Sequence, residues 1–163
     1  SQYGTPPLLL STPEVLVRND DTPKGTIIFS EGNPLSSVFV KLSFIEKQIQ
    51  EGGKEKSEEE KEKETRDLIN RILESLEQDG SSNMLLNPNP FETKDGLKVI
   101  QLAGTLDIKN PKSNEQIRCN LRTIILPFKK VQVELRILYR KEDRYGKEIE
   151  NRIIESLEVL KEL

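Results

Sequence analysis

The last third of the chain carries the clearest hydrophobic pattern, which predicts three strands followed by a helix. From Lys130 to Arg140, apolar and polar residues alternate over the whole segment. The segment from Gln116 to Leu126 alternates in the same way. Because successive side chains of a strand point to opposite faces, both segments are predicted strands. The short connection at 127–129 makes them a hairpin.

The alternation restricts the register of this hairpin to two or three choices, because paired residues share a face. We favour the register that sets Arg122 opposite Glu134 and Leu121 opposite Leu135. Opposite charges across a ladder stabilise it by roughly 0.2 to 1 kcal/mol, and like charges destabilise it. The competing register sets Arg122 opposite Arg136 and would need a bound anion to hold it.

The third strand is predicted from Leu97 to Ile108, where Gly104 indicates a bulge or a closely packed neighbour. A helix is then predicted to begin between Asp143 and Lys147. Its apolar residues recur at 3.6 residues per turn, which predicts one buried face. These residues are Ile149, Ile153, Leu157 and Leu160.

The first part of the chain is less regular. Prolines interrupt residues 1–13, which predicts a flexible tether. Short strands are predicted at 14–18 and 26–30, and a central strand at 37–45, where β-branched and aromatic residues are frequent. After a further strand at 81–87, the sequence Asn87-Pro88-Asn89-Pro90 predicts a break.

One long helix is predicted from Glu58 to Gln78. Ser57 and Glu60 have the spacing of a capping box, and Gly80 stands where a helix commonly ends. The charged segment 54–67 has no apolar stripe, so the start of the helix is expected to project and fray. We expect Glu59 with Lys63, and Glu62 with Arg66, to pair one turn apart.

This order of elements predicts a single α+β domain over 14–163, with a mostly antiparallel sheet and two main helices, one central and one C-terminal. The strand Val131 to Arg140, followed by a terminal helix that ends Ile153-Ile154-Glu155-Ser156-Leu157-Glu158-Val159-Leu160, resembles the PsbP and Mog1 type of α/β/α sandwich. The chain departs from many members in having no tryptophan. The resemblance implies a noncatalytic adaptor, and no functional residue is carried over.

Composition excludes several classes of function. A formal charge of −3 gives the whole molecule no attraction to nucleic acid. With no histidine, the usual general base and the commonest zinc ligand are missing. The one cysteine, Cys119, cannot form an intrachain disulfide, and its parity predicts a buried thiol. We therefore expect no enzyme activity, no metal and no cofactor.

The candidate binding residues are four arginines that the favoured register places on the outward face of the final hairpin. Guanidinium groups hold carboxylates and phosphates through paired hydrogen bonds, so this face would bind an acidic peptide or another anionic ligand. The alternative is an ordinary solvated face. No aromatic residue shares this parity, which argues against single-stranded nucleic acid. The four residues are Arg118, Arg122, Arg136 and Arg140.

The function that these patterns favour is a noncatalytic binding or assembly module with a protein or acidic peptide as partner. The chain opens at Ser1 without methionine and continues into the proline-rich segment. We therefore expect an extracytoplasmic, lipoprotein-type domain in the periplasm or at the cell surface, attached to the cell envelope through a lipid anchor upstream of Ser1. The alternative is a soluble cytoplasmic adaptor of the Mog1 kind.

Overall fold

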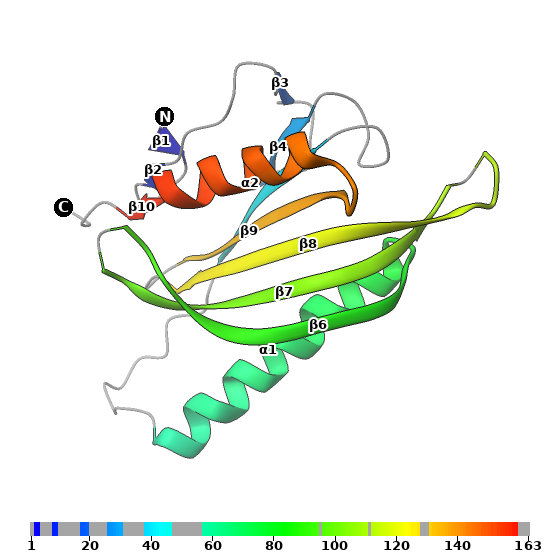
Figure 1. Cartoon of the computed structure of the whole chain (residues 1–163). Coiled ribbons are helices and arrows are strands. Elements are labelled where there is room, and N and C mark those ends of the chain that lie inside the picture. The colour runs from blue at the N-terminus through cyan, green and yellow to red at the C-terminus, as the bar shows by residue number, and fades with distance from the viewer. Residues whose placement is uncertain are drawn as a thin grey trace.

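The structure is a computed structural model that describes residues 2–3, 8–9, 17–19, 26–30, 38–46, 57–94, 96–110, 112–127 and 131–159. A seven-stranded antiparallel sheet lies between two helices, as Figure 1 shows. The strand order is β3-β4-β5-β9-β8-β7-β6. The predicted α+β class is confirmed. The strands are β3 Val17–Asn19, β4 Thr26–Ser30, β5 Phe39–Glu46, β6 Ser81–Glu92, β7 Lys98–Lys109, β8 Gln116–Pro127 and β9 Val131–Arg140.

The path of the chain explains why one helix covers each face. Helix α1, Glu58–Gln78, carries the chain from β5 to β6 at the far edge. The strands then return as a meander from β6 to β9, and β9 pairs with β5. Helix α2, Arg144–Ser156, follows β9 on the opposite face (Figure 1). A small second sheet joins β1, Gln2–Tyr3, and β2, Leu8–Leu9, from the predicted tether to β10, Glu158–Val159.

Helix α1 has the predicted bounds. The Ser57 hydroxyl accepts a hydrogen bond from the Glu60 amide at 3.2 Å, and Gly80 has a φ of 94° just beyond the helix end. The helix is regular from Glu58, and its first half is largely exposed. Among the described residues, neither predicted pair one turn apart forms, and Lys61 instead lies 3.8 Å from Glu58.

Helix α2 begins where the sequence predicts and ends earlier. The Asp143 side chain caps it by accepting a hydrogen bond from the Gly146 amide at 3.0 Å. The helix stops at Ser156, because Leu157 has an extended backbone and the chain enters β10. Leu157 is nevertheless buried, so its apolar spacing reflects the core and not a further helical turn. Leu160 lies outside the described residues.

The core is divided by the sheet into two clusters, which is why the central strands are apolar on both faces. Under α2, Ile149 and Ile153 pack on one parity of β9. Under α1, Ile72 and Leu76 pack on residues of β7 and β8. The first cluster includes Val40, Leu42, Ile124, Leu126, Leu135, Ile137 and Tyr139, and the second includes Leu102, Leu106, Cys119, Leu121, Ile125 and Leu138.

This double burial makes both expected hairpin registers wrong. The structure pairs Arg122 with Ile137 and Leu121 with Leu138. This register is shifted by three residues from the favoured one and by one residue from the competing one, so in both cases the faces are exchanged. The prediction assumed that the more apolar parities of β8 and β9 share a face. In the three-layer structure these parities lie on opposite faces, since each face has its own helix to pack against. Apolar alternation alone cannot decide between the two arrangements.

Strand β6 continues through the prolines that were expected to break the chain. Pro88 pairs with Leu102 and Pro90 with Ile100 in regular antiparallel register. A proline has no N–H to donate, so it fits a strand only where that position points away from the neighbour. Strand β6 is the edge of the sheet, and two prolines two residues apart both point outward from its ladder. The prediction of a break was therefore wrong.

Gly104 marks a close approach between β7 and β6, as predicted. Its φ is 155°, and a Cβ built there would lie 1.9 Å from the carbonyl oxygen of Leu85. The bulge itself is in β6, where the register shifts between Ser82 and Leu85. Any side chain at position 104 would displace this bulge.

Candidate functional site

The four predicted arginines do not share a face. In the observed register, Arg118 and Arg122 lie on the α2 side of the sheet, whereas Arg136 and Arg140 lie on the α1 side. The prediction of one four-arginine surface is wrong, because it assumed a register in which the even-numbered residues of β8 and β9 share a face. Whether any of these residues contacts a partner stays a prediction.

Arg118 belongs to a hydrogen-bonded cluster that joins three strands near the β7–β8 turn. Its guanidinium donates to Asp107 at 3.1 Å, to the Thr105 hydroxyl at 2.6 Å and to the Asn83 carbonyl at 2.8 Å. The Asn83 amide also donates to Asp107. These bonds from Asn83 and Arg118 lower the pKa of Asp107. The cluster holds the β6 bulge against β7 and β8.

Arg136 is 5% exposed and ties β9 to the end of α1. Its Nε donates to Glu134 at 2.9 Å, and its Nη1 lies 3.5 Å from Asp79, the residue that ends α1. The guanidinium is therefore engaged by two carboxylates of its own chain. A buried, paired arginine of this kind connects β9 to the end of α1.

A third cluster lies under α2 and centres on Glu150, which is 4% exposed. Its carboxylate is 2.9 Å from Arg122 Nε and 3.5 Å from Lys147 Nζ. The Tyr139 hydroxyl donates to the other carboxylate oxygen. Burial raises the pKa of Tyr139, and the hydrogen bond to Glu150 raises it further. Sequence reasoning missed Glu150, although its place on the α2 stripe beside Ile149 and Ile153 marked it as facing inward.

Close packing holds this third cluster in place. A Cβ at Gly146 would lie 2.7 Å from the Tyr139 ring, so glycine lets α2 approach the sheet at this point. The short distance between helix and sheet leaves the Tyr139 hydroxyl and Glu150 in contact. The cluster is therefore a rigid polar anchor beneath the helix.

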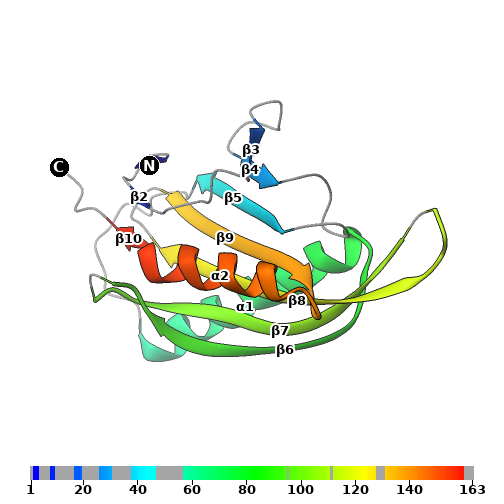
Figure 2. The ribbon, with the colours of Figure 1, turned by 45° about the horizontal axis from the view of Figure 1, so that its top comes forward.

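Beside this anchor, part of the sheet face lies uncovered. Helix α2 lies over β9 and β8, and β7 and β6 extend beyond it, as Figure 2 shows. The side chains there share the α2 face through their pairing, for example Gln101 with Ile124 and Asn89 with Gln101. Most of them are polar, and Ala103 lies among them between Asn87 and Arg122. We call this surface the open polar face, and it consists of Asn87, Asn89, Gln101, Thr105, Asn120 and Arg122.

One feature at the margin of the open polar face favours contact with another molecule, because the large apolar side chain of Leu85 is 68% exposed there. Within the face, Gln101 Oε1 has no hydrogen-bond donor among the described residues, but the atom is buried and does not itself reach the surface. This surface could not be predicted from the sequence, because polar residues on one parity of a strand are equally typical of ordinary solvated sheets.

The described residues do not assemble a group of side chains that could hold a metal ion. Within 57–94, 96–110, 112–127 and 131–159 no group of three or more acidic or cysteine side chains is placed to hold a metal ion. Cys119 is buried as predicted, and burial raises the pKa of its thiol to about 11. A reactive thiolate is thus disfavoured at neutral pH. No helix in the described part of the chain is long and apolar enough to span a membrane.

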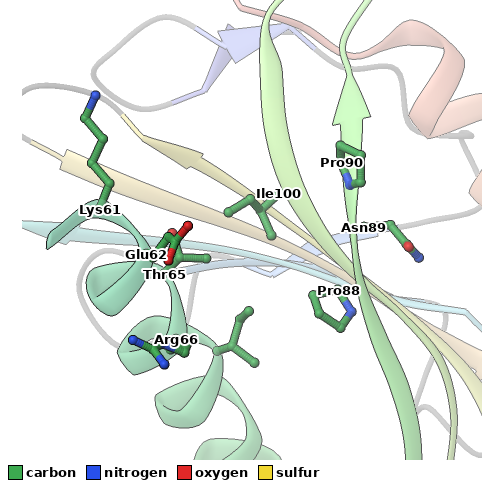
Figure 3. A pocket seen from close by; sticks show the side chains of 9 residues that line it. Lys61, Glu62, Thr65, Arg66, Pro88, Asn89, Pro90 and Ile100 are labelled. Carbon is green, nitrogen blue, oxygen red and sulfur yellow. The ribbon is translucent and has the colours of Figure 1, made fainter. Parts of the chain in front are cut away.

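A groove lies on the α1 face of the sheet. The first half of α1 and the β6 edge enclose a groove of about 570 Å³ (Figure 3). Thr65 and Ile69 line it from the helix, and Pro88, Pro90 and Ile100 from the strands. We call it the α1–β6 groove.

Comparisons with known proteins support the fold alone. No protein-family model and no curated protein matches the chain. A crystal structure of a protein from Bacteroides thetaiotaomicron VPI-5482 aligns over 95% of this chain with a TM-score of 0.52 and 14% identity. The aligned part is 46% of that protein's chain. The α/β/α arrangement therefore occurs in a known structure, and the likeness carries no activity or partner.

Proposed function

We propose that this chain is a noncatalytic binding or assembly module that engages a protein partner through the open polar face. The observation that carries the proposal is that the open polar face lies directly beside the Glu150 cluster under α2. Arg122 belongs to both, since it faces the open strands and contacts Glu150 under α2. A partner bound there would contact side chains of β6 and β7 beside the Glu150 cluster.

The chemistry of the face favours a partner that offers hydrogen bonds over one that offers net charge. Its one charged member, Arg122, is paired with Glu150 within the chain, and the remaining side chains of the face are amides and a hydroxyl. Asn87 and Asn89 are exposed and bring both donors and acceptors. The acidic peptide expected from the sequence is therefore a less suitable partner for this surface than a neutral, polar protein surface.

Site-directed photo-cross-linking in the source cell tests the partner surface. A photoreactive residue at Asn87 is expected to give a discrete adduct with one partner protein. The matched control is the same residue at Glu74, which is exposed on α1 at the other side of the sheet. A Gln101→Arg substitution should remove the Asn87 adduct by filling the face with a charge. The same adducts from both positions, or an adduct unaffected by Gln101→Arg, would contradict the proposal.

We further propose the extracytoplasmic, lipid-anchored location, with a cytoplasmic adaptor as the alternative. What supports it is the resemblance of the last strand and the terminal helix to the PsbP and Mog1 type of α/β/α sandwich. The measurement is the intact mass and membrane fractionation of the native product. An acylated N-terminus that partitions into detergent supports the envelope location. An unmodified product in the soluble fraction supports the cytoplasmic adaptor.

A further inference from the structure

The α1–β6 groove differs from the open polar face in both position and chemistry. It lies on the opposite side of the sheet, where α1 diverges from the strands before its buried residues Ile72 and Leu76 begin. The prolines of β6 turn toward the helix, while the side chain of Asn89 points away from it, as Figure 3 shows. The groove therefore has an apolar floor and strand wall, and its helix wall is formed by one stripe of α1.

The lining is aliphatic. Ile69 and Ile100 contribute branched chains, Pro88 and Pro90 contribute rings without π electrons, and Thr65 contributes a methyl group. Among the described residues no aromatic side chain lines the groove, so a flat aromatic ligand would find no stacking partner there. From Lys61 to Ile69 the helix wall is about 12 Å long. The volume falls within the range of about 300 to 1,000 Å³ that is usual for small-molecule sites.

The charges of α1 are distributed unevenly around this groove. The first half of the helix is rich in glutamate, yet of its acidic residues Glu62 alone lines the groove, against Lys61 and Arg66. Lys61 is partly neutralised by Glu58. Arg66 makes no ion pair within the described part of the chain. An unpaired guanidinium beside an apolar groove is complementary to a ligand that joins a hydrocarbon chain to an anionic end.

We propose that the α1–β6 groove binds a free aliphatic carboxylate, a single hydrocarbon chain that lies between α1 and the prolines of β6 with its carboxylate near Arg66. The hydrocarbon chain of the ligand would cover Ile69 and Ile100, which are only partly buried in the protein. Binding would also fasten the first half of α1 to the sheet. This site is independent of the partner surface on the opposite face.

The test is titration with dodecanoate below its critical micelle concentration, followed by NMR of isoleucine methyl groups. Shifts are expected at Ile69 and Ile100 and not at Ile153, which lies under α2. Thr65→Trp fills the groove from the helix wall and should abolish the shifts while circular dichroism shows an intact fold. Shifts that occur only above the micelle concentration, or that survive Thr65→Trp, would overturn the proposal.

The role of Arg66 is tested separately with matched variants and probes. Arg66→Gln is expected to weaken dodecanoate binding about two- to fivefold, the size of an exposed ion pair. Arg71→Gln removes a charge from the same helix outside the groove and should have no effect. Dodecanol has the same chain without the charge, and its binding should be equal in wild type and Arg66→Gln. Equal effects of Arg66→Gln and Arg71→Gln would overturn the assignment of the carboxylate.

Discussion

Helices α2 and α1 cover opposite faces of one sheet and are attached to it in different ways. Helix α2 lies close to β9 along its length, with Ile149 and Ile153 buried and Glu150 held in an ion pair beneath it. Helix α1 is longer, but its buried residues, Ile72 and Leu76, lie in its second half. The shorter helix is thus the more firmly fixed of the two.

The difference shows how polar residues can determine the position of a helix. Apolar contacts under α2 would permit small shifts along the sheet, whereas the bond between Tyr139 and Glu150 requires one placement. At the end of helix α1, Asp79 meets Arg136 in a longer and more exposed ion pair. The first half of α1 is free to diverge, which creates the α1–β6 groove. The two proposed binding surfaces follow from these two modes of attachment.

Removal of the Glu150 carboxylate is expected to weaken the attachment of α2 more than any other change considered. Glu150→Ala leaves Arg122 and Lys147 without their counter-charge and Tyr139 without its acceptor, so a loss of about 3 to 5 kcal/mol in unfolding free energy is expected. Urea denaturation measures it. The exposed Glu148→Ala on the same helix should change stability by less than about 0.5 kcal/mol. Similar losses from both variants would show that the buried cluster does not anchor α2.

A smaller effect is expected from trimming the apolar contacts of each helix. Ile153→Ala leaves a cavity in a fully buried position and should cost about 2 to 4 kcal/mol. Ile69→Ala removes the same atoms from a half-buried position at the groove, where water can enter, and should cost about 1 kcal/mol. Thermal and urea unfolding of both variants give the comparison. A greater loss for Ile69→Ala would mean that α1 is the better attached helix.

The sequence predicts the elements of this fold well and their relation in space less well. The bounds of α1 follow from local signals, since the Ser57 cap and Gly80 act within one turn of the helix ends. The continuous strand through Pro88 and Pro90 could not be predicted, because it depends on β6 being an edge. Whether a strand lies at an edge depends on the order of all strands in the sheet, and the residues next to the prolines in the sequence do not indicate it.

The candidate site was mispredicted for a related reason. Alternation fixes which residues of one strand share a face, but the relation between two strands depends on what covers each face. One step of register moves Arg122 from the side of Arg136 to the side of Glu150. The hairpin alone does not show that a second helix covers the sheet. To predict the open polar face and the α1–β6 groove, one must know where each helix ends its contact with the strands.

The prolines of β6 also limit how the molecule can associate with others. A foreign strand that joins a sheet edge needs alternate backbone N–H groups as donors, and at Pro88 and Pro90 these donors do not exist. Copies of this chain therefore cannot stack edge to edge through this part of β6, which protects crowded solutions of the protein against fibril growth from that edge. A physiological partner is likewise directed away from strand addition there and toward side-chain contacts on the faces of the sheet.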